Sequence, residues 1–177
     1  MTRTLTVTLA VVLASALPAA AQSKALAEAM QRLHAGVARN VVEAAEAMPE
    51  SEYGFKPSED VRSFGALVAH IANSNYSYCS RAGGVANPNS TDFETKTAKA
   101  DLVAAVKAAV AFCDGVYTQQ TDASFAELIA MGRNQAPRGM VLVQNISHNN
   151  EHYGNIVTYM RIKGHVPPSS ARSGGLD

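Results

Sequence analysis

The chain has 177 residues, and its 15 lysines and arginines are balanced by 15 aspartates and glutamates, so its formal net charge at pH 7 is zero. No basic stripe stands out along the sequence, which argues against nucleic acid as a partner. Tryptophan is absent, whereas alanine and valine are abundant, a composition that favours closely packed helices. The length suits one domain with its own hydrophobic core.

The N-terminal segment has the features of a secretory signal peptide. Arg3 gives a short positive start, residues 5–17 form a mainly apolar run, and small residues follow at 19–21. We therefore predict a signal peptide over residues 1–21, cleaved before Gln22. The apolar run is shorter than the roughly 20 residues that span a bilayer, although an uncleaved anchor is the alternative.

Cleavage at this point removes Arg3 and leaves 14 basic against 15 acidic side chains, a net charge of −1. We expect residues 22–177 to form one domain, exported to the periplasm or secreted, with no membrane segment after cleavage. Dimerisation through exposed helix faces is left open.

Four segments show apolar residues every three to four positions, the period of an α-helix that buries one face. The predicted helices span residues 23–48, 63–81, 97–117 and 140–163. Ser23 and Ser63 are the expected N-caps of the first two. Residues 118–137 are the least regular, and the stretch 125–129 suits either a strand or a helical turn. The pattern predicts an all-α protein, a four-helix bundle.

Two cysteines bear on the order of these helices. Cys79 lies sixteen residues after Ser63, and Cys113 lies sixteen residues after Thr97. If the second and third helices run parallel, the two sulfurs reach the same height, and in an exported protein an even pair is a disulfide candidate. A disulfide therefore predicts up-down-down-up topology. The alternative is two buried free thiols.

Three histidines are candidate metal ligands. His148 and His152 are four residues apart, which places both side chains on one face of a helix. His70, on another predicted helix, would complete a three-ligand site with an open position for water or substrate. Neutral imidazole suits zinc, nickel, copper or iron. The alternative is three polar core residues that bind their neighbours. His34 and His165 are predicted to lie on the surface.

Two stretches share a pattern with a known family. Residues 62–73 (RSFGALVAHIAN) surround His70, and the second stretch is His148-x-x-x-His152-x-Gly154-Asn155, followed by Tyr159-Met160-Arg161-x-x-Gly164 and Pro167-Pro168. Together they resemble the DinB-like superfamily over most of residues 22–177, with Asn155 where that family usually has Gln. The resemblance implies an up-down-down-up bundle and a divalent metal, zinc or nickel, on histidines that match His70, His148 and His152.

The family resemblance also implies that some relatives are transferases or isomerases that use low-molecular-weight thiols. We therefore expect an exported metal-dependent enzyme, a hydrolase or a thiol-type transferase, whose small-molecule substrate enters between the second and fourth helices. Its catalytic residues and its substrate are not indicated by the sequence.

Three other functions are compatible with the sequence. The first is a non-catalytic protein that binds a metal or a small ligand, and the second is a structural module without metal. The third is a zinc peptidase of the inverted H-x-x-E-H type, with Glu151 as general base. The peptidase is disfavoured because such enzymes need a third acidic ligand downstream, and Asp177 is the only acid after His152.

Overall fold

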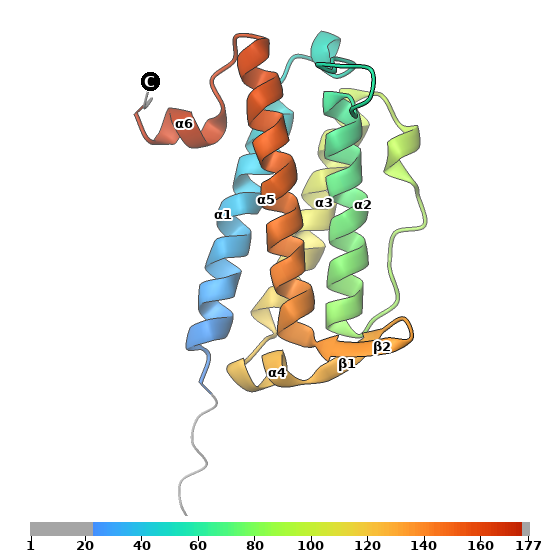
Figure 1. Ribbon diagram of the computed structural model, residues 1–177, viewed down its shortest axis with the longest axis vertical. Helices are drawn as coiled ribbons and strands as arrows, with labels where there is room; N and C mark the ends of the chain where they lie inside the picture. The colour runs from blue at the N-terminus through green and yellow to red at the C-terminus, as the bar shows by residue number, and fades with distance from the viewer. Residues whose placement is uncertain (1–22, 175–177) are drawn as a thin grey trace, which may run out of the picture.

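Four long helices form the body of the protein (Figure 1). The computed structural model describes residues 23–174, so the predicted signal peptide at 1–21 lies outside the described residues. The long helices are α1 (Ala25–Ala47), α2 (Phe64–Gly83), α3 (Lys99–Thr118) and α5 (Arg138–Ile162). The predicted four-helix bundle is therefore confirmed. No helix within the described residues is long and apolar enough to cross a membrane.

Shorter elements connect the long helices and follow the last one. They are the 3-10 turns η1 (Glu50–Glu52) and η2 (Phe93–Thr95), the helices α4 (Asp122–Ala126) and α6 (Pro168–Arg172), and the antiparallel strands β1 (Leu128–Met131) and β2 (Asn134–Pro137). The irregular segment before α5 thus changes from helix to strand near residue 127, so both alternatives for it were partly right.

The order of the long helices is up, down, down, up (Figure 1). Helix α2 packs between α3 and α5, and α1 packs between the same two helices on the other side, so α1 and α2 are diagonal partners. The chain from 84 to 98 returns along the outside of the bundle to start α3 beside the start of α2. This agrees with the predicted topology.

The N-caps predicted for the first two long helices can be compared with the structure. Ser63 caps α2 as predicted, because its hydroxyl accepts a hydrogen bond from Ala66 N at 3.2 Å. The prediction for Ser23 was wrong: the N-cap of α1 is Lys24, without a side-chain hydrogen bond. Instead, Asp122 Oδ1 accepts from Ala27 N at 2.9 Å, so the first residue of α4 satisfies the start of α1.

Gly139 is closely packed where α4 meets α5. A Cβ on Gly139 would lie 3.0 Å from Cβ of Phe125 and 3.2 Å from its carbonyl oxygen, which is too close for any larger residue to fit without a shift. Arg138 N also donates to Glu127 O at 2.8 Å. These contacts hold the α4–hairpin segment against the start of α5.

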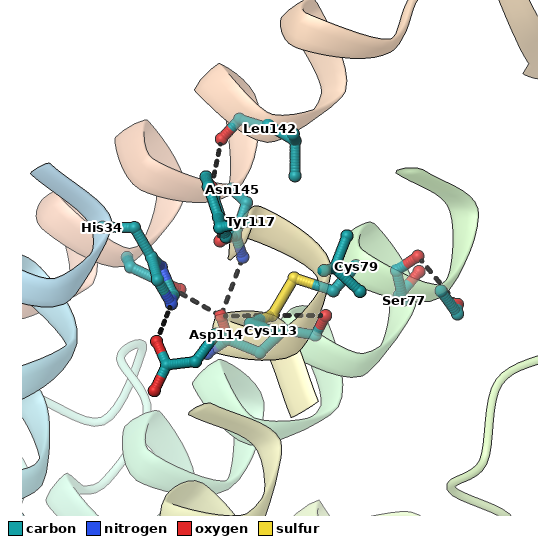
Figure 2. The surroundings of a disulfide bond; sticks show 12 residues. His34, Ser77, Cys79, Cys113, Asp114, Tyr117, Leu142 and Asn145 are labelled. Carbon is teal, nitrogen blue, oxygen red and sulfur yellow. Dashed lines mark hydrogen bonds and ion pairs between the residues drawn. A yellow bond between two sulfur atoms is a disulfide. The ribbon is translucent and has the colours of Figure 1, made fainter. Parts of the chain in front are cut away.

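A disulfide joins α2 to α3. Cys79 and Cys113 are fully buried, with their Cα atoms 5.3 Å apart, at matching heights on two parallel helices (Figure 2). The cysteine argument from the sequence therefore agrees with the structure. Beside the bridge lies Asn75, whose carbonyl oxygen is 3.3 Å from Cys113 Sγ. Asn75 Oδ1 accepts hydrogen bonds from the amides of Asn145 and Asn149 on α5, at 2.8 and 2.9 Å.

The prediction that His34 lies on the surface was wrong. Its ring is fully buried on α1 and stacks on Tyr117 of α3, with centroids 4.2 Å apart (Figure 2). Its Nε2 is 3.1 Å from Asp114 Oδ1, but the angle is not that of a hydrogen bond. Burial lowers the pKa of His34, and the nearby Asp114 carboxylate opposes that shift only in part. His165, by contrast, is partly exposed and pairs with Glu52.

The disulfide should contribute measurably to stability. Replacing both Cys79 and Cys113 by alanine is expected to lower the free energy of unfolding by about 3–4 kcal/mol, because the bridge closes a 34-residue loop in the unfolded chain. Urea denaturation under oxidising conditions measures the loss. Reductant should destabilise the natural chain but leave the double variant unchanged. An equal midpoint for both chains without reductant would contradict this account.

His34 should make stability depend on pH. Its pKa is near 6.5 in the unfolded chain and lower in the folded one, so below pH 6.5 the unfolded state binds a proton that the folded state refuses. We expect the free energy of unfolding to fall as the pH is lowered from 8 to 5, and to fall less in His34→Gln. Denaturation curves across this range test this, and equal slopes in both chains would rule out His34 as the cause.

Candidate metal centre

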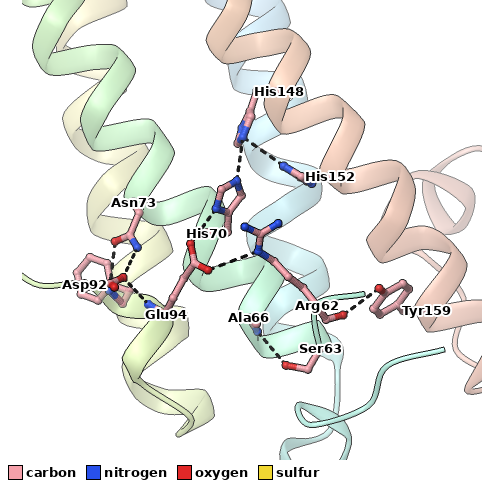
Figure 3. A network of polar contacts seen from close by, with 11 residues as sticks. Arg62, Ser63, Ala66, His70, Asn73, Asp92, Glu94, His148, His152 and Tyr159 are labelled. Carbon is pink, nitrogen blue, oxygen red and sulfur yellow. Dashed lines mark hydrogen bonds and ion pairs between the residues drawn. The ribbon is translucent and has the colours of Figure 1, made fainter. Parts of the chain in front are cut away.

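Three histidines converge near the middle of the α2–α5 contact. His70 projects from α2, and His148 and His152 project one turn apart from α5 (Figure 3). The Nε2 of His148 is 3.1 Å from Nε2 of His70 and 3.2 Å from Nε2 of His152. Two nitrogens that each lie about 2.1 Å from one ion, at angles of 90–109°, are about 3.0–3.4 Å apart. The cluster could therefore bind a metal.

The protonation states of the α5 pair favour metal binding. Burial lowers the pKa of both His148 and His152, and neighbouring positive charge, from the other histidines and from Arg62, lowers it further. The pKa of His152 falls to about 4. Both rings are therefore neutral at pH 7, and neutral imidazole is the form that donates a lone pair to a metal.

The outer nitrogens of the three rings differ. Nδ1 of His148 and Nδ1 of His152 are buried, and neither has a hydrogen-bond partner within residues 23–174. Nδ1 of His70 lies 2.8 Å from Glu94 Oε1. A carboxylate that accepts the Nδ1 proton leaves the lone pair on Nε2, which faces the other two rings. The structure thus orients His70 through Glu94.

The position of Glu94 is fixed by α2 itself. Asn73, one turn after His70, donates from Nδ2 to Asp92 Oδ1 at 2.7 Å, and its Oδ1 accepts from Phe93 N at 3.2 Å. The same oxygen of Asp92 accepts from Glu94 N at 3.0 Å and so caps η2. Two side chains of α2 therefore hold this turn, as Figure 3 shows. Asn73 bonds to Asp92 and to Phe93 N, and His70 bonds to Glu94.

Sequence reasoning missed Glu94, because it lies in the long connection between α2 and α3, where no periodic pattern exists. The only signal was an acidic residue in a segment that must pass α2 on its way back to the start of α3. Two asparagines of α5 form no hydrogen bond to the three histidines within the described residues. Asn145 bonds to Asn75 and Tyr117, and Asn155 lines the cavity beside His152.

A cavity of about 360 Å³ opens beside His152. It lies between α2, α5 and the loop before α2. Its walls are formed by Pro57, Ser58, Asp60, Val61, Arg62, Leu67, His152, Asn155 and Tyr159. The Tyr159 hydroxyl donates to the backbone oxygen of Arg62 at 2.9 Å, which fastens this loop to α5. A second cavity of the same volume, between α1 and α3, is lined by no histidine.

Glu151, the general base of the peptidase alternative, is exposed and forms no ion pair within residues 23–174. The Tyr153 hydroxyl donates a hydrogen bond to Ser169 of α6. Tyr78 packs edge-on against His148, with ring centroids 5.6 Å apart. Among the residues that the structure describes, Glu94 is the one carboxylate bonded to the triad.

Comparison with known proteins identifies the family. Residues 33–156 match the family model of the DinB superfamily. The chain belongs to the DinB superfamily. It is 29% identical over 135 residues to the uncharacterised protein YjoA of Bacillus subtilis strain 168, a match that covers 72% of this chain and 85% of YjoA.

Solved structures show the same DinB-like fold. The crystal structure of a DinB-like protein from Bacillus cereus ATCC 10987 superposes with a TM-score of 0.69 at 17% identity, over 80% of this chain and 95% of that one. YjoA itself gives a TM-score of 0.65 at 22% identity, over 78% and 93%. A mycothiol-dependent maleylpyruvate isomerase gives 0.58 at 13% identity, over 73% and 60%.

Removing the Glu94 carboxylate should weaken metal binding. Glu94→Ala is expected to lower affinity for zinc about 10- to 100-fold, because His70 loses the acceptor that orients its ring. Glu94→Gln should lose less, since its amide oxygen can still accept the proton. Competition with a chelator measures both. Glu59→Ala, which removes an exposed glutamate paired with Lys56, is the control and should bind zinc like the natural chain.

Proposed function

We propose that this member of the DinB superfamily is an exported enzyme that depends on one divalent transition metal, zinc or nickel, held by His70, His148 and His152. The observation that carries the proposal is the convergence of three Nε2 atoms beside a cavity of small-molecule size. Three protein ligands leave coordination positions for water or substrate, as in catalytic rather than structural sites.

The chemistry that such an ion supplies is activation of a bound water or thiol by lowering its pKa. We infer a hydrolase or a thiol-type transferase. The likeness to the fold of a mycothiol-dependent isomerase supports the second reading, although it extends to the fold alone. The roles of the chain's own residues are to hold the ion, to orient His70 through Glu94 and to admit a small substrate beside His152.

Export is proposed on two grounds. The segment 1–21 has the composition of a signal peptide. The disulfide between Cys79 and Cys113 is of a kind that persists in oxidising compartments such as the periplasm. Both point to a periplasmic or secreted protein.

A second candidate function is binding without turnover. One observation favours it: the cavity wall has few groups that could transfer a proton. The Tyr159 hydroxyl is already bonded to the Arg62 backbone, and burial raises its pKa. Asp60 is exposed at the rim. A protein that captures a metal or a small ligand would need no such group.

Elemental analysis tests the site. Protein isolated from the periplasm, or incubated with zinc or nickel salts, should hold about one ion per chain, because three ligands suffice for a tight site. His148→Ala should lose the ion, and His165→Ala, which removes a histidine outside the triad, should keep it. The absence of metal from the natural chain after both treatments would refute the proposal. Metal without turnover of thiol or ester substrates would favour the binding function.

A further inference from the structure

The cavity beside His152 contains one positively charged side chain, Arg62. It stands directly before the cap of α2, and Figure 3 shows its guanidinium turned toward the three histidines. Its backbone is held by Tyr159, so the start of the side chain is fixed while the side chain as a whole remains 45% exposed. This cation is thus placed at the boundary between the cavity and the candidate metal centre.

The guanidinium is only partly used by the protein. Its one hydrogen bond within the described part of the chain is from Nε to Glu94 Oε2, at 3.4 Å, which is long for a charge-assisted hydrogen bond. Neither Nη atom has a hydrogen-bond partner within residues 23–174. Glu94 meanwhile uses its other oxygen for His70. A planar guanidinium with free N–H groups is suited to bind an oxyanion through two parallel hydrogen bonds.

We propose that Arg62 receives an anionic oxygen group, a carboxylate or a phosphate, on the molecule that occupies the cavity beside the histidines. The inference rests on the proposed function, and it adds the chemical class of the substrate. An anion so bound would be attracted by both the guanidinium and the ion on the triad. Pro57, Val61 and Leu67 supply apolar wall for the rest of the molecule.

The preference would come from the position of Arg62, since the cavity as a whole carries no excess charge. Asp60 is on the same wall, and its carboxylate would repel an anion placed near it. A ligand with one anionic end is therefore favoured over a ligand with negative charges along its length. Recognition of one anionic group by Arg62 differs from general electrostatic attraction to the cavity, because salt would weaken the general attraction more.

The test uses benzoate and benzamide, which have nearly the same shape but differ in charge. Both are titrated into the zinc-loaded and the metal-free protein, and calorimetry measures the affinity in every chain. NMR follows the Nε–H signal of Arg62 in the natural chain. We expect benzoate to shift this signal and to bind at least tenfold more tightly than benzamide. Arg62→Gln should abolish the preference, and Arg62→Lys, which keeps the charge but loses the planar fork, should retain part of it. Zinc content should not change in either.

Arg161→Gln is the matched control, because Arg161 lies on α5 and bonds to Ser170. It should keep the full preference for benzoate. Inorganic phosphate, titrated in parallel, distinguishes carboxylate from phosphate recognition. The inference is overturned if the natural chain does not prefer benzoate, or if Arg62→Gln keeps the preference. It is also overturned if both Arg62 variants lose zinc or stability, since Arg62 would then be a structural residue.

The outcomes separate this inference from the proposed function. A chain that binds zinc but shows no preference for benzoate keeps the proposed function and loses the role of Arg62. A chain that prefers benzoate through Arg62 in the metal-free state, and takes up no zinc, keeps the role of Arg62 and loses the metal-dependent function.

Discussion

The parallel packing of α2 against α3 is the constraint on which the other features of this protein depend. Two parallel helices cannot be joined by a tight turn, because the chain must return along the whole length of a helix, about 30 Å for twenty residues. The segment 84–98 makes this return on the outside of the bundle. It passes α2 at the height of His70, and there η2 presents Glu94. An antiparallel pair would have needed only a short loop, and His70 would have had no carboxylate from this direction.

The register between α2 and α5 decides whether the three histidines meet. The α5 pair is set by helical spacing alone, whereas His70 must arrive at the same height from another helix. Asn75 fixes that height, because its buried Oδ1 accepts hydrogen bonds from both Asn145 and Asn149. If α5 moved by one turn, one of these two amides would take the place of the other, and a buried amide would be left without its partner at considerable cost. The polar groups beside the disulfide thus set the height at which the three histidines meet.

The residues that the sequence predicted correctly are those whose signals are local or periodic. The period of apolar residues placed the four helices within a few residues, Ser63 was found from its position before an apolar run, and the equal spacing of Cys79 and Cys113 from their helix starts indicated the topology. The histidine triad was suggested by a four-residue step and a family motif. These features depend on a single helix or on a comparison between two helices.

What the sequence could not indicate depends on contacts between distant segments. Glu94 lies in a connection without periodicity, and only the return path of the chain brings it to His70. His34 was expected at the surface, but it is buried and stacks on Tyr117. The cap of α1 was assigned to the adjacent Ser23, whereas the structure uses Asp122. In each case a partner far away in sequence overrides the local preference.

That last contact bears on the order in which the chain can fold. The first turn of α1 is completed by a side chain 95 residues later, so a chain that is still being synthesised reaches α4 long after α1 has emerged. Until then the first helix lacks this partner for its first turn, and the α5 surface that also buries it follows later still. Helix α1, although first in sequence, is therefore fully packed only after α5 is available. Contacts within a helix are local, but the folding of this bundle thus ends with a slow step in which segments distant in sequence must meet.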